Sequence, residues 1–250
     1  MKTTKKQENK KAAYVTEYKG YHSEKILDKF AAALIEAKAE VRADLENGTA
    51  RVKISDRNSK MGEIPSISTL PFFTCPAVCK GTCAPSCYAA KLANLRPAVL
   101  HAYAYNTALY LLNQDAYFEQ IAEFTQGCRF FRWHVSGDIV NASYFAEMVK
   151  IAGNTPHCDF LAFTKSFKIV NDWISSNGAL PENLHVIFSG WTNMTPENPH
   201  GLPETTVYIK EEDFDAERWL SCGGNCFHCA CRGLGCWKAQ SGDIIAFKKH

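Results

Sequence analysis

Cysteine is the residue whose number and spacing in this sequence point most directly to chemistry. Nine of the 11 cysteines fall in two short windows. The first window contains Cys75, Cys79, Cys83 and Cys87, and the second contains Cys222, Cys226, Cys229, Cys231 and Cys236. In a chain without a secretory leader, thiols crowded in this way are typical of metal or cluster binding rather than of disulfides. We therefore predict two metal-binding sites.

The first window has the spacing C-x3-C-x3-C-x3-C. Pro76, Gly81 and Pro85 oppose a regular helix there, so a loop is expected to curl its thiolates around one centre. Zinc ribbons usually carry C-x2-C pairs, whereas compact loops with several cysteines are typical of iron–sulfur ligation. We predict an iron–sulfur loop over 75–87, with zinc as the less favoured alternative and all of its cysteines as candidate ligands.

The second window is rich in glycine, which lets a backbone turn tightly around a metal. Its best set of ligands is Cys222, Cys226, Cys229 and Cys236, which leaves Cys231 over and His228 as a substitute ligand. This spacing fits zinc and a second [4Fe–4S] cluster about equally well. Because a full set of thiolates leaves no open coordination position, we expect a structural site. Cys128 and Cys158 stand alone beside apolar runs and are interpreted as core residues.

The hydrophobic pattern predicts the elements around the first window. An amphipathic helix is expected over 24–46, ended by Asn47-Gly48, and a strand over 50–55 is expected to follow. A long loop over 56–74 then leads to the first window. After that window, a helical stretch interrupted by Pro97 runs to about residue 113. Another helix is expected over 115–126, with Asp115 as its cap.

The middle of the chain alternates between strand-like and helix-like segments. Short apolar runs occur at 130–135, 160–163, 185–188 and 206–209, and helical stretches over 143–153 and 167–176 separate the first three. This rhythm predicts an α/β fold with a parallel sheet covered on both faces. An acidic, exposed stretch over 211–218 and a final strand over 243–247 are also expected. We divide the chain into a flexible basic tail (1–20), an α/β core (21–210) and a Cys-rich metal-binding segment packed on that core (211–250).

Polar residues follow three of the predicted strands. The first run leads into Ser136-Gly137-Asp138, the second into Thr164-Lys165-Ser166 and the third into Ser189-Gly190. Ligands of α/β proteins collect at the carboxyl ends of parallel strands, which meet at one edge of the sheet. Since the iron–sulfur loop precedes the same sheet, the sequence predicts a ligand site at this edge.

Composition and charge narrow the classes of function. The chain has 250 residues, is 46% hydrophobic and has a formal net charge of +2, which indicates a globular protein and excludes disorder as its main state. The near-neutral charge weighs against a nucleic-acid partner, because phosphate contacts need clustered Lys and Arg. No apolar run approaches the ~20 residues of a membrane span, and the N-terminus is too polar for a signal peptide. We therefore expect a cytoplasmic protein that does not bind membranes.

The stretch from Ser59 to Trp237 resembles the "gene product 88" domain family of phages and mobile elements. The motifs that carry the resemblance are Cys83-Ala84-Pro85-Ser86-Cys87-Tyr88-Ala89, the run from Arg132 to Asp138, the run from Phe160 to Lys165, the run from Leu180 to Leu184, and Cys236-Trp237. This family is distantly similar to radical S-adenosylmethionine (SAM) proteins. That similarity implies a partial (β/α) barrel of parallel strands, with a [4Fe–4S] cluster at its top and SAM bound to an open iron.

The resemblance also implies roles for individual residues. Ser136, Gly137 and Asp138 match the turn that holds the SAM amine, Ser189 matches a ribose contact, and Tyr88 follows the last loop cysteine. Lys165 and His134 would line the substrate side as catalytic residues. The superfamily spacing is C-x3-C-x2-C, from which this loop departs. An open iron requires that only Cys75, Cys83 and Cys87 ligate the cluster, which makes Cys79 a spare.

Three functions follow from these features. The first is a radical SAM enzyme that acts on an unknown small-molecule or macromolecular substrate and takes its electron from a ferredoxin or flavodoxin. The second is a non-catalytic cluster- or metal-binding protein of a mobile element, with a nucleic-acid or regulatory role. The third is an electron carrier with two clusters.

Overall fold

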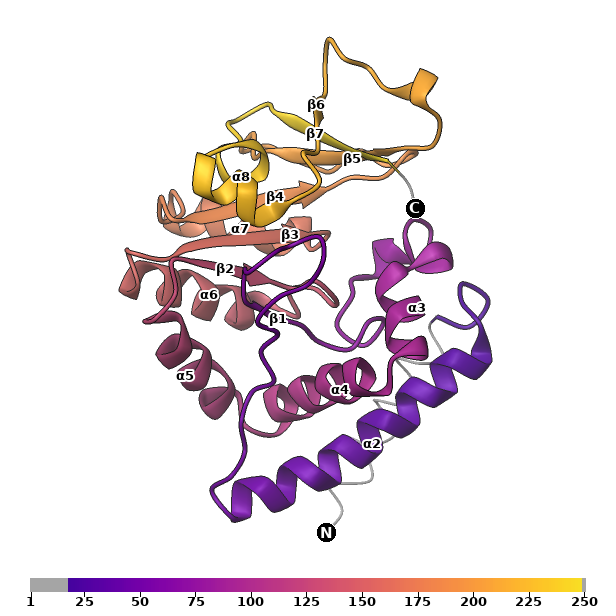
Figure 1. Cartoon of the computed structure of the whole chain (residues 1–250), viewed down its shortest axis with the longest axis vertical. Helices are drawn as coiled ribbons and strands as arrows, with labels where there is room; N and C mark the ends of the chain where they lie inside the picture. Colours follow the sequence, from indigo (N-terminus) through magenta and orange to yellow (C-terminus); the bar gives the residue numbers. More distant parts are fainter. Residues whose placement is uncertain (1–17, 249–250) are drawn as a thin grey trace.

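The centre of the molecule is a parallel sheet, which confirms the predicted α/β fold. The structure is a computed structural model of the chain and describes residues 18–248. The seven strands lie in the order β1-β2-β3-β4-β5-β7-β6 (Figure 1). They are β1 (Ser66–Ile67), β2 (Phe130–Trp133), β3 (Asp159–Thr164), β4 (Leu184–Ser189), β5 (Glu204–Tyr208), β6 (Leu220–Ser221) and β7 (Ile244–Lys248). An open order that starts at β1 and ends at β6 is compatible with a partial barrel.

Helices connect the strands much as the sequence predicted. They are α2 (Glu24–Glu46), α3 (Tyr88–Leu95), α4 (Pro97–Leu112), α5 (Gln114–Thr125), α6 (Ala142–Asn154), α7 (Phe167–Asn177) and α8 (Cys226–Arg232). Short 3-10 turns are η1 (Ala77–Cys79), η2 (Ala84–Ser86), η3 (Glu211–Asp213) and η4 (Gly235–Trp237). Helix α3 ends before Pro97, which begins α4, as proline at a first helical position allows.

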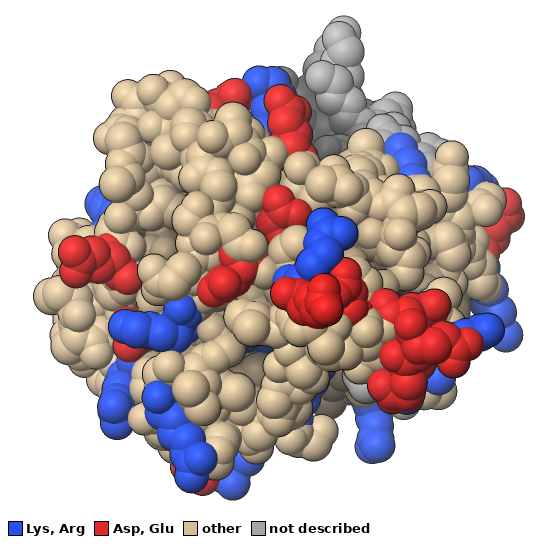
Figure 2. Space-filling view, turned by 90° about the horizontal axis from the view of Figure 1, so that it is seen from above, with Lys and Arg blue, Asp and Glu red and all other residues tan. Residues whose placement is uncertain are grey.

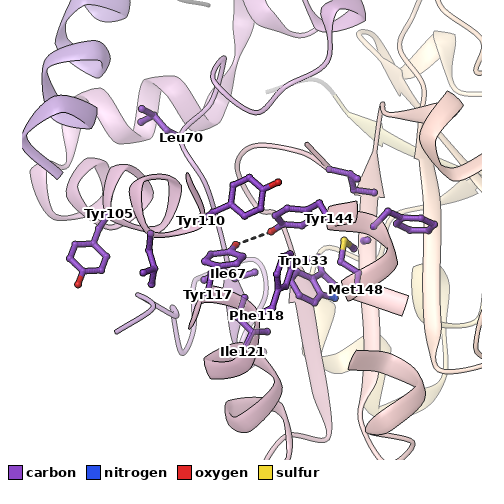
Figure 3. Packing of buried hydrophobic residues seen from close by; sticks show 14 of the residues in the cluster. Ile67, Leu70, Tyr105, Tyr110, Tyr117, Phe118, Ile121, Trp133, Tyr144 and Met148 are labelled. Atoms are coloured by element: carbon purple, nitrogen blue, oxygen red, sulfur yellow. Dashed lines mark hydrogen bonds between the residues drawn. The ribbon is translucent and has the colours of Figure 1, made fainter. Parts of the chain in front are cut away.

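The two faces of the sheet bury two separate groups of side chains. Successive residues of a strand point to opposite faces, so Phe160 and Ala162 of β3 join the main core while Leu161 joins a smaller one. The main core lies between the sheet and α4–α7, and it is rich in aromatic rings (Figure 3). The smaller core contains Ala230 of α8 and Trp237 of η4, so the Cys-rich segment covers the other face.

The loop predicted over 56–74 contains the two-residue strand β1. Two further details of the predicted elements are wrong, and both involve asparagine side chains. Residues 50–55 do not form a strand, because Asn106 of α4 accepts from the Lys53 N–H at 2.7 Å and donates to the Lys53 carbonyl at 2.9 Å. These bonds satisfy the backbone groups that a neighbouring strand would otherwise need. Helix α5 is capped by Asn113, whose side chain accepts from the Ala116 N–H, and not by Asp115.

Several other predictions concern single residues or short stretches. Residues 1–17 of the predicted tail lie outside the described residues, and Tyr18 is buried against Phe72. Cys158 is fully buried in the core, as predicted, and Cys128 is partly buried at its edge. The acidic stretch after β5 is exposed at Glu211, Glu212, Asp213 and Glu217, and acidic side chains gather on the face shown in Figure 2. Among residues 18–248, no helix has the length and apolar character to cross a bilayer.

Candidate metal centre

One cavity of about 780 Å³ brings the two cysteine windows together. It is lined by Cys75, Cys79, Cys83 and Cys87 of the first window and by Cys222, Cys226, Cys229 and Cys236 of the second. The other predicted site residues also line it: Tyr88, His134, Ser136, Gly137, Asp138, Lys165 and Ser189. The cavity lies at the carboxyl ends of β2, β3 and β4, where α/β proteins bind ligands. The structure therefore places every predicted site residue around a single space, whereas their chemical roles stay predictions.

The iron–sulfur loop is fixed at both ends. Residues 68–74 connect it to β1, and within this connection the Thr69 N–H donates to the Ser136 carbonyl at 3.0 Å. The Tyr18 hydroxyl donates to the Pro76 carbonyl at 3.0 Å. At the other end, the Cys87 thiol caps α3 by accepting from the Ala90 N–H at 3.5 Å. The loop is thus tied to the turn after β2, to Tyr18 and to α3.

The thiols of the first window lie in different electrostatic surroundings. Cys79 is 4% exposed, and hydrogen bonding with the Cys75 and Cys83 thiols, together with burial, raises its pKa. The bond from Cys79 and the nearby Lys165 ammonium lower the pKa of Cys83 to about 7. Burial raises the pKa of Cys87 to about 12. Burial favours the neutral form of a thiol, whereas binding to a metal removes the thiol proton. A metal centre would therefore convert these buried thiols to the thiolate form, and in that sense it fits the first window.

Asp138 and Lys165 link the ends of β2, β3 and β4. The Asp138 carboxylate is 5% exposed and accepts from the Ile139 N–H at 2.7 Å, the Lys165 N–H at 2.8 Å and the Thr164 hydroxyl. Burial raises the pKa of Asp138, and these donors oppose that rise. The Lys165 ammonium donates to the carbonyl and hydroxyl of Ser189 at 2.6 and 2.7 Å. Side chains that had been predicted as separate ligand contacts thus form one connected network.

Gly137 is needed for the turn between these groups. Its φ is +82°, and a Cβ there would lie 1.9 Å from Thr69 Oγ1 and 2.5 Å from Thr74 Oγ1. Those threonine hydroxyls are 2.9 Å apart and hold the turn against the iron–sulfur loop. A side chain at this position would therefore push the loop away from the end of β2.

We expect Gly137→Ala to destabilise the fold by about 3 kcal/mol, the sum of a left-handed backbone penalty and overpacking. The measurement is the free energy of unfolding in urea. Gly153→Ala is the matched control, because a Cβ there meets nothing within 4 Å and its φ is not positive. Alanine in a helix should leave stability unchanged or raise it by up to ~1 kcal/mol. Equal effects of the two substitutions would show that the turn tolerates a side chain.

His134 is buried at the end of β2 and bonded to the core. It is 4% exposed, and its Nε2 lies 2.9 Å from the Tyr144 hydroxyl, which lies 2.8 Å from the Tyr117 hydroxyl (Figure 3). Burial, helped by the Arg132 charge, lowers the pKa of His134 from 6.5 to about 3. The imidazole is therefore neutral at physiological pH, and a pKa this far below the operating pH favours a hydrogen-bonding role over proton transfer.

This lowered pKa predicts acid sensitivity. Below pH 6.5 His134 is protonated in the unfolded chain, whereas in the folded chain it stays neutral down to about pH 3. Folding stability should therefore fall by about 2 kcal/mol between pH 7 and pH 5 through this residue alone. The measurement is urea unfolding of the wild type and of His134→Asn at both pH values. The difference between the two proteins gives the contribution of His134, because the other histidines titrate in both. A pH dependence that His134→Asn leaves unchanged would contradict this expectation.

The second window is held between the sheet and the loop before β1. The Cys222 N–H donates to the Ala246 carbonyl of β7 at 3.2 Å, and the Cys226 N–H donates to the Lys60 carbonyl at 3.0 Å. Asn225 caps α8. Burial raises the pKa of Cys236 to about 12. Cys231 and His228 are exposed and do not line the cavity, which agrees with their being left out of the best set of ligands.

Arg132 is a site residue that sequence reasoning did not single out. Its guanidinium NH1 lies 4.0 Å from the Cys226 thiol, and its Cζ lies 4.6 Å from the centre of the Phe163 ring. Its charge opposes the rise in the pKa of Cys236 and of Tyr88, which follows the first window. It is therefore a cation of the cavity with an electrostatic effect on a cysteine of the second window and on the tyrosine next to the first. The only sequence feature that pointed to Arg132 was its position at the start of the run that leads through His134 to Asp138.

The donors around the cavity suit an iron–sulfur cluster. Among the described residues, no group of three or more His, Cys, Asp or Glu side chains has the arrangement of a single-ion site. Thiols on one irregular loop, with the Lys165 ammonium close to Cys83, match the ligand type and charge of an iron–sulfur cluster.

Comparison with known proteins gives a family but no characterised relative. A family model described as gene product 88 matches residues 2–231, a range that includes the iron–sulfur loop, the strand ends and most of the second window. No curated protein and no solved structure shows a significant match to the chain. The chain belongs to the gene product 88 family.

Proposed function

We propose that this protein is an iron–sulfur protein that binds a [4Fe–4S] cluster through Cys75, Cys83 and Cys87 and SAM beside it, for radical chemistry on a substrate in the cavity. The observation that carries the proposal is the placement of the iron–sulfur loop. It follows β1 and opens into the same cavity as the ends of β2, β3 and β4. The resemblance to radical SAM proteins implies this same arrangement.

The residues of the chain have distinct tasks in this proposal. When bound and reduced, such a cluster supplies the electron that cleaves SAM and starts hydrogen abstraction, and a ferredoxin or flavodoxin would reduce it. Cys79 is not a ligand in this proposal, which leaves one coordination position of the cluster open, and its thiol is buried in the loop. Asp138 Oδ2 accepts a bond from the Lys165 N–H and keeps a lone pair for the SAM amine. Tyr88 closes one side of the cavity, since its hydroxyl donates to the Val135 carbonyl.

Anaerobic iron and sulfide quantification with EPR tests the proposal. We expect the reconstituted, reduced protein to give a cluster signal that changes on addition of SAM, and to release 5′-deoxyadenosine. S-adenosylhomocysteine is the control for binding without cleavage. A cluster whose spectrum is the same with and without SAM would reject the open iron. Absence of both iron and sulfide after reconstitution would reject the cluster itself.

The shared cavity also favours a second candidate, an electron carrier with a centre in each window. The windows face one space, and Arg132 influences the pKa of groups beside each of them. Redox titration separates the two candidates. A carrier would show two cluster signals with no response to SAM, whereas the proposed enzyme would show a response from the first window. Zinc in the second window would contradict the electron carrier and would be compatible with the proposed enzyme.

A further inference from the structure

Helix α3 presents apolar side chains to solvent as well as to the core. Its alanines are buried in the core. Its other face carries three large side chains at positions i, i+4 and i+7: Tyr88 is 58% exposed, Leu92 is 40% exposed and Leu95 is 64% exposed. A surface helix normally has polar residues on its solvent side, and a group of exposed apolar residues marks an interaction site. We call these three residues the α3 face.

The α3 face is continuous with the iron–sulfur loop. Cys87, a ligand in the proposed function, is the N-cap of α3, so Tyr88 is the next residue along the chain. The loop reaches the surface at Pro85 and Ser86, which are exposed and come just before Cys87. Tyr88 and Leu92 also line the cavity. A partner seated on the α3 face would therefore lie beside the exposed end of the loop.

The charge around the α3 face is positive. The sequence contains no Asp or Glu over 64–114. Lys91 and Arg96 lie within and just after α3, are exposed, and form no ion pair with a carboxylate of residues 18–248. From the neighbouring α2, Lys29 donates to the Asn94 carbonyl of α3 at 2.8 Å. Acidic proteins are steered toward such a surface, and salt weakens the attraction.

These features select the kind of partner. A partner for the α3 face needs a surface that is partly apolar and partly acidic, and it would act where the iron–sulfur loop reaches solvent. Electron-transfer proteins of the ferredoxin and flavodoxin type are acidic, and redox complexes have small interfaces. A nucleic acid fits less well, because the leucines of the face neither stack on bases nor bind phosphate.

We propose that the α3 face docks an acidic electron-transfer protein that reduces the cluster of the first window. With a flavodoxin, one electron leaves the flavin hydroquinone, which becomes the semiquinone, and [4Fe–4S]²⁺ becomes [4Fe–4S]⁺. No bond forms or breaks in this step. The electron transfer rests on the proposed function, whereas the docking of an acidic protein on the α3 face does not.

Titration calorimetry of the full chain, reconstituted with iron and sulfide, against a flavodoxin tests the docking. We expect binding at about 50 mM salt and about 10-fold weaker binding at about 500 mM, because salt screens exposed charges. Arg96→Glu and Leu95→Ser should each weaken binding about 10-fold, a difference of about 1.4 kcal/mol. Lys150→Glu and Ile35→Ser are the matched controls, because both residues are exposed on other helices and do not line the cavity.

Reduction by two different donors separates docking from damage to the cluster. Stopped-flow absorption follows the cluster while either reduced flavodoxin or dithionite, a small reductant, supplies the electron. Leu95→Ser leaves the charge of the chain unchanged, and we expect it to slow reduction by flavodoxin about 10-fold. Reduction by dithionite should keep its rate. Equal slowing with both reductants would show that the substitution disturbs the cluster itself, and would overturn the proposal.

Each outcome supports or overturns the assignment. Absence of flavodoxin binding, or equal binding by the wild type and Leu95→Ser, would overturn it. A dimer in light scattering that Leu95→Ser converts to a monomer would assign the α3 face to a second copy of the chain instead. Binding of a single-stranded oligonucleotide that Arg96→Glu abolishes, without flavodoxin binding, would assign the face to nucleic acid. A SAM-responsive cluster without flavodoxin binding overturns this inference alone, and flavodoxin binding by a chain that takes up no iron overturns the proposed function alone.

Discussion

Cys83→Ala is expected to abolish the cluster of the first window, and Cys79→Ala is expected to retain it. Cys83 is a ligand in the proposal, and the nearby Lys165 ammonium would balance the charge of its thiolate. Cys79 is the loop cysteine that is not a ligand in the proposal, and it is buried at 4% exposure. The measurement is iron and sulfide per chain with EPR after anaerobic reconstitution.

The chain offers two controls for this comparison. The second window stays unaltered in both variants, so its metal content serves as an internal reference. Cys128→Ala is the control for loss of a thiol outside the cavity, because Cys128 lies at the edge of the core and does not line the site. If Cys79→Ala loses as much iron as Cys83→Ala, all of the loop cysteines ligate and no iron is open. SAM chelation would then be impossible.

Asp138→Ala is expected to destabilise the fold by about 4 kcal/mol, an effect far larger than that of losing one ligand contact. Its carboxylate accepts from the backbone N–H groups of Ile139 and Lys165 and from the Thr164 hydroxyl. Alanine would leave these buried donors without partners and would remove the negative charge near the Lys165 ammonium. The measurement is the free energy of unfolding in urea, compared with the wild type.

The control for this substitution is Asp172→Ala on α7. Asp172 is exposed and pairs only with Lys168 on the same helix, so its removal should not change stability measurably. Asp138→Asn separates charge from shape, because an amide can still accept from two of the donors but turns an N–H₂ group toward the third. We expect the free energy of unfolding of Asp138→Asn to lie between those of the wild type and Asp138→Ala. If Asp138→Ala is as stable as the wild type, the carboxylate is a ligand group and not part of the framework.

The strand–helix rhythm of the middle of the chain was predictable because burial on both faces leaves apolar runs of strand length. The runs before His134, Thr164 and Ser189 are of this kind, and each became a strand. The polar residues after them met at one edge because parallel strands end on the same side. The cysteine spacing likewise predicted that Cys231 is outside the best set of ligands, and Cys231 does not line the cavity.

Other features depended on contacts between residues far apart in sequence. Residues 50–55 alternate like a strand, but Asn106, over 50 residues later, takes up the backbone groups of Lys53. The two-residue strands β1 and β6 are too short to give a periodic signal. Arg132 looked like an ordinary charged residue of a strand. Its place between the windows depends on α8, which folds onto the other face of the sheet.

The pairing of β7 has a consequence for the order in which the protein is assembled. Strand β6 pairs only with β7 among the described strands, and the Cys222 N–H is held by the Ala246 carbonyl of β7. During synthesis, Cys222 is therefore not fixed in place until residues 244–248 have left the ribosome. The iron–sulfur loop is held by Tyr18, β2 and α3, which emerge much earlier. The cluster proposed for the first window could thus be inserted before the thiols of the second window are brought into place.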